Sequence, residues 1–236
     1  MIFDLIQTSK FLYGGAFAIV GKEGVVGDAK MKSPITGLRA GDSVDLPEWS
    51  IGFRRHAIRM APTHAHDYER NDAEMPTDVC AVQVDGAAKG EVYLARVREH
   101  QKKALLNLIP TRYRIARMRC AGVTYSVYPA APPELPQGWC VAYCVYVGDI
   151  QVAEVRVPSY VLNNLYRYRI FIGDAPGTVD GDDLAVAAVV IGCYLHLMDY
   201  RGEVVTDASY ALERPRITDK RLLSRFDPEF APRIAP

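Results

Sequence analysis

The chain has 236 residues, and its 28 Lys and Arg balance its 28 Asp and Glu, so the formal net charge is zero. Hydrophobic residues make up 49% of it, which is a globular composition and excludes disorder of the whole chain. A chain of this length buries a core without needing a disulfide or a metal. The five cysteines, an odd number, include no CxxC pair and indicate a reducing compartment. The first residues lack the pattern of a secretory signal, so we expect a cytoplasmic protein.

Segments with period-two alternation dominate the chain up to residue 157. They are rich in Val, Ile and Tyr, which predicts β-strands with one face turned to a core. Short turn signals such as Ala121-Gly122 and Gly148-Asp149 separate several of them and indicate antiparallel hairpins. The clearest such segments are residues 17–20, 91–98, 112–115, 123–128, 140–147 and 150–157.

Residues 32–78 interrupt this pattern. The stretch contains four prolines and three of the five histidines, with little sustained alternation. We therefore predict an insertion or a long excursion between strands, with some local structure near residues 49–60.

A single helix is predicted at about residues 183–197. Residues 184–195 include no polar side chain, and Asp180, Asp182 and Asp183 precede them as capping carboxylates. Such a helix is about 22 Å long, short of the roughly 30 Å hydrocarbon core of a membrane, so we do not expect a transmembrane segment. A helix that is apolar all round must be covered all round.

The segments before this helix are nearly all predicted strands, which favours a closed antiparallel β-barrel wrapped round it. A closed barrel also removes exposed strand edges. The alternative is a sheet on one face of the helix and a partner chain on the other. We expect one barrel domain over residues 1–200, followed by a C-terminal extension at 201–236 that contains a last strand near residues 203–210.

Three stretches resemble the tubby-like superfamily, which includes the LURP-one-related proteins, the phospholipid scramblases and bacterial-type tubby C-terminal-like domains. They are the opening hairpin at residues 11–28, the apolar turn and strand at 105–115, and the strand at 168–174 followed by the acidic cap and apolar helix. The resemblance covers roughly residues 1–31 and 79–198. It implies a mainly β fold, a barrel of about twelve strands filled by a C-terminal hydrophobic helix.

The zero net charge hides two opposed neighbouring stretches. Residues 89–119 contain nine basic and two acidic side chains, a charge of +7, whereas residues 67–85 contain one basic and six acidic side chains, a charge of −5. On a regular strand Arg112 and Arg114 would lie outside, with Tyr113 and Ile115 turned to the core. A bulge near Ala116 would bring the next two arginines onto the same surface.

The basic positions on these strands, with the Arg-Tyr-Arg-Ile motif repeated at 167–170, are our candidates for an anion-binding surface. The alternatives are ordinary polar surface positions, or pairing with the acidic stretch. The resemblance adds a class of ligand, because tubby-like domains that bind phosphoinositides use basic residues on strands. The candidate residues are Arg96, Arg98, Lys102, Lys103, Arg112, Arg114, Arg117, Arg119, Arg167 and Arg169.

Familiar catalytic motifs are missing: there is no phosphate loop, no GxGxxG, no GxSxG and no HExxH. The weak candidate for a metal or acid–base site is the cluster of His64, His66 and Asp67, since histidines two residues apart on a strand share a face. A solvated loop is the favoured interpretation of this cluster. We therefore expect no enzyme activity and no cofactor.

The leading hypothesis is a non-enzymatic cytoplasmic protein, peripheral at the membrane, that binds anionic phospholipid or another phosphate-bearing or acidic partner through the basic strands. A first alternative is a structural or protein-interaction module that uses residues 32–78 and the C-terminal extension. A second is a metal-dependent enzyme at the histidine cluster. Nucleic acid is not an expected partner, because barrel-lining aromatics account for the tyrosine-rich strands.

Overall fold

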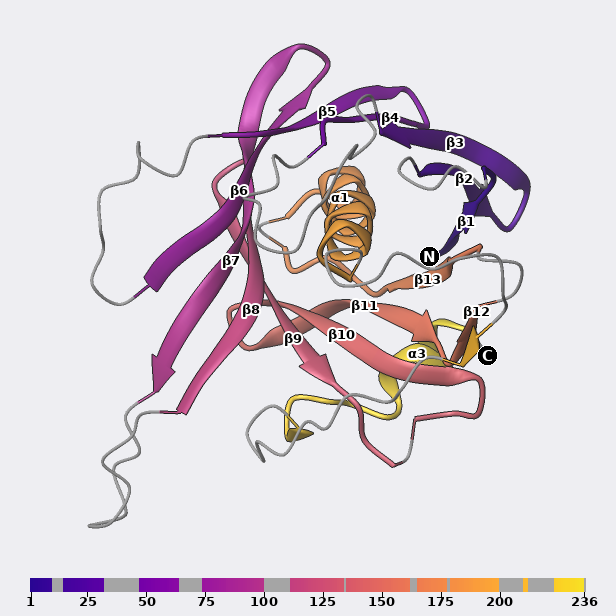
Figure 1. Ribbon diagram of the computed structural model, residues 1–236, viewed down its shortest axis with the longest axis vertical. Coiled ribbons are helices and arrows are strands. Elements are labelled where there is room, and N and C mark those ends of the chain that lie inside the picture. The colour runs from indigo at the N-terminus through magenta and orange to yellow at the C-terminus, as the bar shows by residue number, and fades with distance from the viewer. Residues whose placement is uncertain are drawn as a thin grey trace.

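A closed antiparallel barrel of twelve strands surrounds one long helix in the computed structural model (Figure 1). This architecture confirms the predicted fold class. The residues that the structure describes are 1–9, 15–31, 47–63, 74–99, 111–133, 135–161, 165–177, 179–199, 210–211 and 223–235.

The barrel is a meander in which each strand pairs with the next, and the first strand closes the ring against the last. In chain order its strands are β1 (Ile2–Gln7), β2 (Ala16–Gly21), β3 (Gly24–Met31), β4 (Trp49–Phe53), β5 (His56–Pro62), β6 (Glu74–Val84), β7 (Ala87–Glu99), β8 (Thr111–Cys120), β9 (Val123–Ala130), β10 (Trp139–Val147), β11 (Ile150–Pro158) and β13 (Arg167–Ile172). A separate pair joins β12 (Tyr160–Val161) to β14 (Tyr210–Ala211). The helices are α1 (Gly181–Asp199) and α3 (Phe230–Ile234).

Tight turns connect neighbouring strands at Ala121-Gly122, where the sequence predicts one, and at Asp85-Gly86. Ala121 and Gly122 have φ angles of 50° and 79°, and Asp85 and Gly86 have 52° and 80°. Positive φ at both central residues defines the type I′ turn, whose twist matches that of the flanking strands. The predicted hairpin at Ala121-Gly122 is therefore confirmed.

The core helix α1 begins with a side-chain cap. The Asp180 carboxylate accepts hydrogen bonds from the backbone N–H groups of Asp182 at 2.7 Å and Asp183 at 3.3 Å, which satisfies two otherwise unpaired donors of the first turn. Residues 184–197 are buried throughout. By length and composition Gly181–Met198 could cross a membrane, but 78% of that stretch is buried inside the barrel, as expected for a core helix.

His196 closes the last turn of α1 among aromatic rings. Its side chain is 1% exposed, its Nδ1 lies 2.9 Å from the Tyr168 hydroxyl, and its ring centroid lies 4.7 Å from that of Phe17. Burial lowers the pKa of His196 to about 3 because the surroundings disfavour the charged form. The imidazole is therefore neutral at physiological pH.

The predicted insertion at 32–78 differs from the structure where the structure describes it. Residues 49–53 and 56–62 form β4 and β5, which are barrel strands paired with β3 and β6. The side chains of Trp49, Ile51 and Phe53 are buried in alternation with half-buried or exposed neighbours. The alternating segment is only five residues long here. The four prolines of residues 32–78 therefore outweighed it, and the sequence predicted an insertion instead of barrel strands. The remainder of residues 32–78, outside β4 to β6 and their flanks, is not among the described residues.

Gly90 in β7 is required by the close approach of β8. A Cβ atom at this position would lie 1.7 Å from the Arg119 carbonyl oxygen, a backbone atom that cannot move without breaking the β7–β8 ladder. We expect Gly90→Ala to lower the free energy of unfolding by about 2–3 kcal/mol, measured by urea denaturation. Gly177→Ala is the matched control, because no atom lies within 4 Å of its added Cβ. Equal stability of the two variants would contradict the prediction.

Candidate functional site

The basic stretch at 89–119 folds into the paired strands β7 and β8. Their register runs without a shift from Gly90 opposite Cys120 to Glu99 opposite Thr111. It places two pairs of arginines directly opposite each other across the strands. They are Arg96 opposite Arg114 and Arg98 opposite Arg112, and we call these four positions the basic ribbon. Figure 1 shows these ends of β7 and β8 extending away from α1, at the lower left of the view.

Like charges directly opposite each other in a sheet repel and destabilise the pairing. Two residues along a strand span about 6.6 Å, and neighbouring strands lie about 4.8 Å apart. Four positive positions therefore lie within a patch about the size of one or two phosphate groups. The side chains of Arg96, Arg98, Arg112 and Arg114 lie outside the described part of the structure, so the register of the backbone defines this patch.

The other two arginines of β8 lie on the opposite face of the strand. The bulge expected near Ala116 is absent, because the registers of β8 with β7 and with β9 are both continuous. Ala116, Met118 and Cys120 belong to the core around α1. Arg117 and Arg119 occupy the alternate positions, on the face of Ile115. The prediction that one surface carries all four arginines of β8 was therefore wrong.

Ile115 does not face the barrel core, contrary to the prediction. It packs on the outside with three neighbouring side chains in a cluster that we call the outer cluster, made of Val79, Tyr93, Ala95 and Ile115. Arg119 lies beside this cluster, with its guanidinium 5.7 Å from the Tyr93 ring centroid and 3.5 Å from the Glu91 carboxylate. Its side chain is 57% exposed, so this ion pair adds little stability.

Arg167 and Arg169 form a separate group on β13. Three strands, β11, β10 and β9, separate β13 from β8 around the barrel, so the structure does not bring these arginines to the basic ribbon. Asp4 of β1 holds both of them: its carboxylate accepts hydrogen bonds from Arg169 at 2.8 and 3.1 Å and from Arg167 at 2.7 Å. Burial alone would raise the pKa of Asp4, but these hydrogen bonds lower it below its ordinary value.

The acidic stretch at 67–85 lies next to the basic one. Its second half forms β6, which pairs with β7 so that Met75 stands opposite Arg96. Asp85, at the β6–β7 turn, accepts hydrogen bonds from His56 and from the Ala57 backbone. Several predicted site residues lie outside the described part of the chain: Lys102, Lys103, His64, His66 and Asp67. Within the described part, no group of three or more potential ligands could hold a metal ion.

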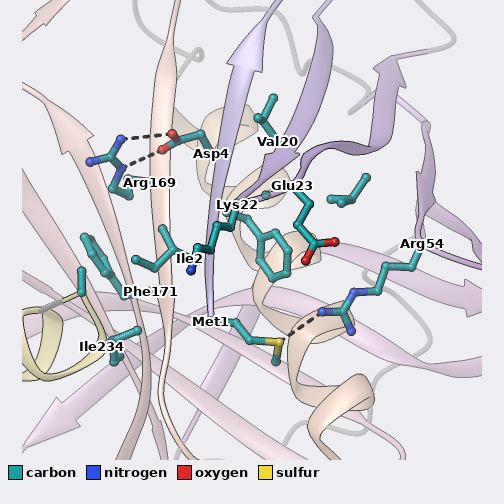
Figure 2. Close-up of a pocket in the computed structure, with 14 residues that line it drawn as sticks. Met1, Ile2, Asp4, Val20, Lys22, Glu23, Arg54, Arg169, Phe171 and Ile234 are labelled. Atoms are coloured by element: carbon teal, nitrogen blue, oxygen red, sulfur yellow. Dashed lines mark hydrogen bonds and ion pairs between the residues drawn. The ribbon is translucent and has the colours of Figure 1, made fainter.

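A pocket of about 780 Å³ lies beside β1. Figure 2 shows the Arg169–Asp4 pair on one side of it and Arg54 on the other, with Glu23 between them. Apolar side chains from β1, β13 and α3 complete the wall. Its volume is within the range of small-molecule sites, roughly 300–1,000 Å³, and the mixture of apolar surface with charges of both signs suits an amphipathic molecule. Sequence reasoning missed it because its residues come from distant parts of the chain.

His56 links three elements at one end of the barrel. Its Nδ1 lies 2.8 Å from an Asp85 oxygen, and its Nε2 lies 3.0 Å from an oxygen of Asp182, in the first turn of α1. Arg54 also donates to Asp182, at 2.8 Å. The hydrogen bonds to Asp182 and then to Asp85 raise the pKa of His56. The β4–β5 turn and the β6–β7 turn are thereby joined to the N-terminus of α1.

We expect the stabilising effect of His56 to depend on pH. Because its pKa is raised in the folded state, the contribution is fully present below the ordinary histidine pKa and is lost as the pH rises through the folded pKa. Replacing His56 by Gln should therefore lower the Tm more at pH 6 than at pH 9. A loss of the same size at both pH values would show that the charged form of His56 contributes nothing.

Comparison with protein-family models, with curated proteins and with solved structures found no match for this chain.

Proposed function

We propose that this protein is a non-enzymatic barrel protein that binds an anionic phospholipid surface through the basic ribbon. The observation that supports the proposal is the cross-strand pairing of Arg96 with Arg114 and of Arg98 with Arg112. Guanidinium groups suit phosphate because their fork of donors matches its oxygens. The resemblance of the sequence to tubby-like domains points to the same class of ligand.

Such a protein would act at the cytoplasmic face of a membrane as a peripheral protein. A basic residue close to an anionic membrane surface contributes about 1 kcal/mol to binding. Four of them on one ribbon give about 4 kcal/mol at low ionic strength, and this contribution falls as salt screens the charges. The barrel provides the rigid support that keeps the two strands in register.

Vesicle flotation tests the proposal. The wild-type protein should float with vesicles that contain about one third anionic lipid and stay behind with purely neutral vesicles. The double variant Arg112→Glu/Arg114→Glu converts the basic ribbon from four positive charges to two of each sign. Its binding should weaken by at least about a hundredfold, since about 1.4 kcal/mol corresponds to a factor of ten.

The control is Lys22→Glu/Lys89→Glu, which makes the same change in net charge. Both side chains are exposed, and both lie away from the basic ribbon. This variant should keep most of the binding of the wild-type protein. If the wild-type protein does not bind anionic vesicles at low salt, or if the two double variants lose binding equally, the basic ribbon is not a specific lipid-binding site.

A further inference from the structure

Residues 223–235, which we call the C-terminal segment, lie on the outside of the barrel. The Tyr146 hydroxyl of β10 donates a hydrogen bond of 2.5 Å to the Arg225 carbonyl. The Arg225 guanidinium lies 4.3 Å from the ring centroid of Tyr128 in β9 and 5.5 Å from that of Tyr146. The start of the segment is thus held by two tyrosines of neighbouring strands through a hydrogen bond and cation–π contacts.

Two phenylalanines, four residues apart, anchor the C-terminal segment to the outer surface of the sheet. Phe226 packs against the cluster of Ala130, Cys144 and Tyr146. Phe230, at the start of α3, packs with Phe171 of β13. The residue after Phe171 and Ile172 is Gly173, where a Cβ atom would come within 3.1 Å of the Phe230 ring. A side chain at position 173 would therefore force the Phe230 ring to shift by a few tenths of an ångström.

A pair of charges lies on the same outer surface. Glu154 and Arg156 of β11 are 0% and 5% exposed, and Arg156 Nε donates to Glu154 Oε1 at 2.5 Å. The guanidinium lies 4.9 Å from the ring centroid of Phe171, the ring against which Phe230 packs. Among the described residues Arg156 Nη2 has no hydrogen-bond partner. The C-terminal segment thus adjoins this guanidinium without satisfying it.

We propose that the outer surface of β9, β10, β11 and β13 is a peptide-binding surface, occupied by the chain's own C-terminal segment. The partner that fits it is a peptide with two aromatic side chains four residues apart and a carboxylate that reaches Arg156. The resident segment supplies the aromatic anchors but no acid for this guanidinium. The Asp227 carboxylate of this segment already forms an ion pair within the segment, with the Arg233 guanidinium at 2.6 Å.

The preference for an acidic peptide follows from the Arg156 Nη2 donor, for which the resident segment provides no acceptor among the described residues. A buried donor without a partner is costly, and a hydrogen bond from a charged donor is stronger than a neutral one. A peptide that pairs with Arg156 gains a factor of about ten to a hundred in affinity over one that does not. This gain would let such a peptide compete with a segment that is tethered to the barrel.

Fluorescence anisotropy with labelled peptides and the full-length protein tests the proposal. The first probe is residues 223–235, and the second is the same peptide with Ala231→Glu, which places a carboxylate beside Phe171. Full-length Phe226→Ala/Phe230→Ala protein, whose own segment is weakened, should bind the first probe at least tenfold more tightly than the wild type does. The second probe should bind about tenfold more tightly again, and Arg156→Lys should remove that gain.

The controls separate this surface from others. Ile150→Ala removes an exposed apolar side chain at the first residue of β11, away from the two phenylalanine anchors, and should leave peptide binding as in the wild type. Equal binding of the first probe to the wild type and the double variant would overturn the proposal. A second probe without a gain in affinity would overturn the acidic partner. If the protein forms a dimer by exchanging C-terminal segments, the partner of this surface is a second copy of the chain, and the proposal of a separate acidic peptide is overturned.

Hydrogen exchange on the wild-type protein gives a test that needs no variant. An excess of the first probe should speed the exchange of amides in α3 while the amides of α1 stay protected. If the amides of α3 exchange only together with those of α1, the C-terminal segment is a permanent part of the barrel and the proposal fails.

Discussion

Replacing Arg156 by Met should lower the free energy of unfolding by about 3–5 kcal/mol, because it leaves a carboxylate buried without its counter-charge. Glu154 has no exposed surface, and Arg156 is the cation that donates to it. Burial already raises the pKa of Glu154 above its ordinary value. Without the guanidinium this carboxyl must take up a proton or move to solvent. Guanidinium chloride denaturation at pH 7 measures the loss.

The matched control removes both charges. The variant Glu154→Gln/Arg156→Met should recover most of the lost stability, because a buried ion pair replaced as a whole by neutral side chains is often close to neutral in free energy. The loss in the single variant should also shrink as the pH falls and Glu154 becomes protonated. If the single and double variants are equally unstable, the packing of the Arg156 side chain, and not its charge, is what matters.

Acidification from pH 7 to pH 5 should remove about 2 kcal/mol of stability through His196 alone. Its pKa of about 3 in the folded state lies below the value of 6.5 for a free side chain. Between these two values the unfolded chain binds a proton that the folded chain does not. The free energy of unfolding therefore falls with decreasing pH, by about 1.4 kcal/mol per pH unit for one proton.

The variant His196→Asn isolates this effect. An asparagine at position 196 cannot take up a proton in this range. The fall in the free energy of unfolding between pH 7 and pH 5 should therefore be about 2 kcal/mol smaller in the variant than in the wild type. Urea denaturation of both proteins at the two pH values gives the comparison. The same pH dependence in both proteins would mean that other groups account for the acid sensitivity.

The barrel could be predicted because one segment restricts the rest of the fold. An apolar run such as residues 184–195, preceded by the capping Asp180, is a helix that needs cover on all sides, and only strands were left to supply it. Where the residues of one strand face are buried and those of the other are only half-buried, as in β1 with Phe3 and Leu5 inside, alternation also indicates the inner face.

The face assignment in β8 failed for a physical reason. Here both faces are partly buried: Met118 packs toward α1, while Ile115 packs into the outer cluster. Alternation then gives the two faces but does not say which of them is inside. The arginines at positions 112 and 114 were assigned to the outside because of their charge, although the continuous register gives them the parity of Met118, which faces α1.

The sites depend on contacts between distant parts of the chain. Arg169 meets Asp4 only because β13 closes the barrel against β1. The close fit of the Phe230 ring against Gly173, where an added Cβ atom would lie 3.1 Å from it, is a relation that no local pattern encodes. The sequence could predict a basic region here because its arginines are close along the chain. It could not predict which arginines lie opposite each other, because that depends on the register of β7 and β8.

The order of the elements along the chain has a consequence for folding. The helix that fills the barrel follows all twelve strands, and the ring closes only when Ile2 pairs with Phe171. During synthesis, at about 5–20 residues per second, the first strands emerge from the ribosome many seconds before α1. Because contacts between such distant residues form slowly, the nascent strands pass through a period without their apolar filling. Chaperones that hold exposed apolar strands should therefore bind the nascent chain most strongly just before residues 181–199 emerge.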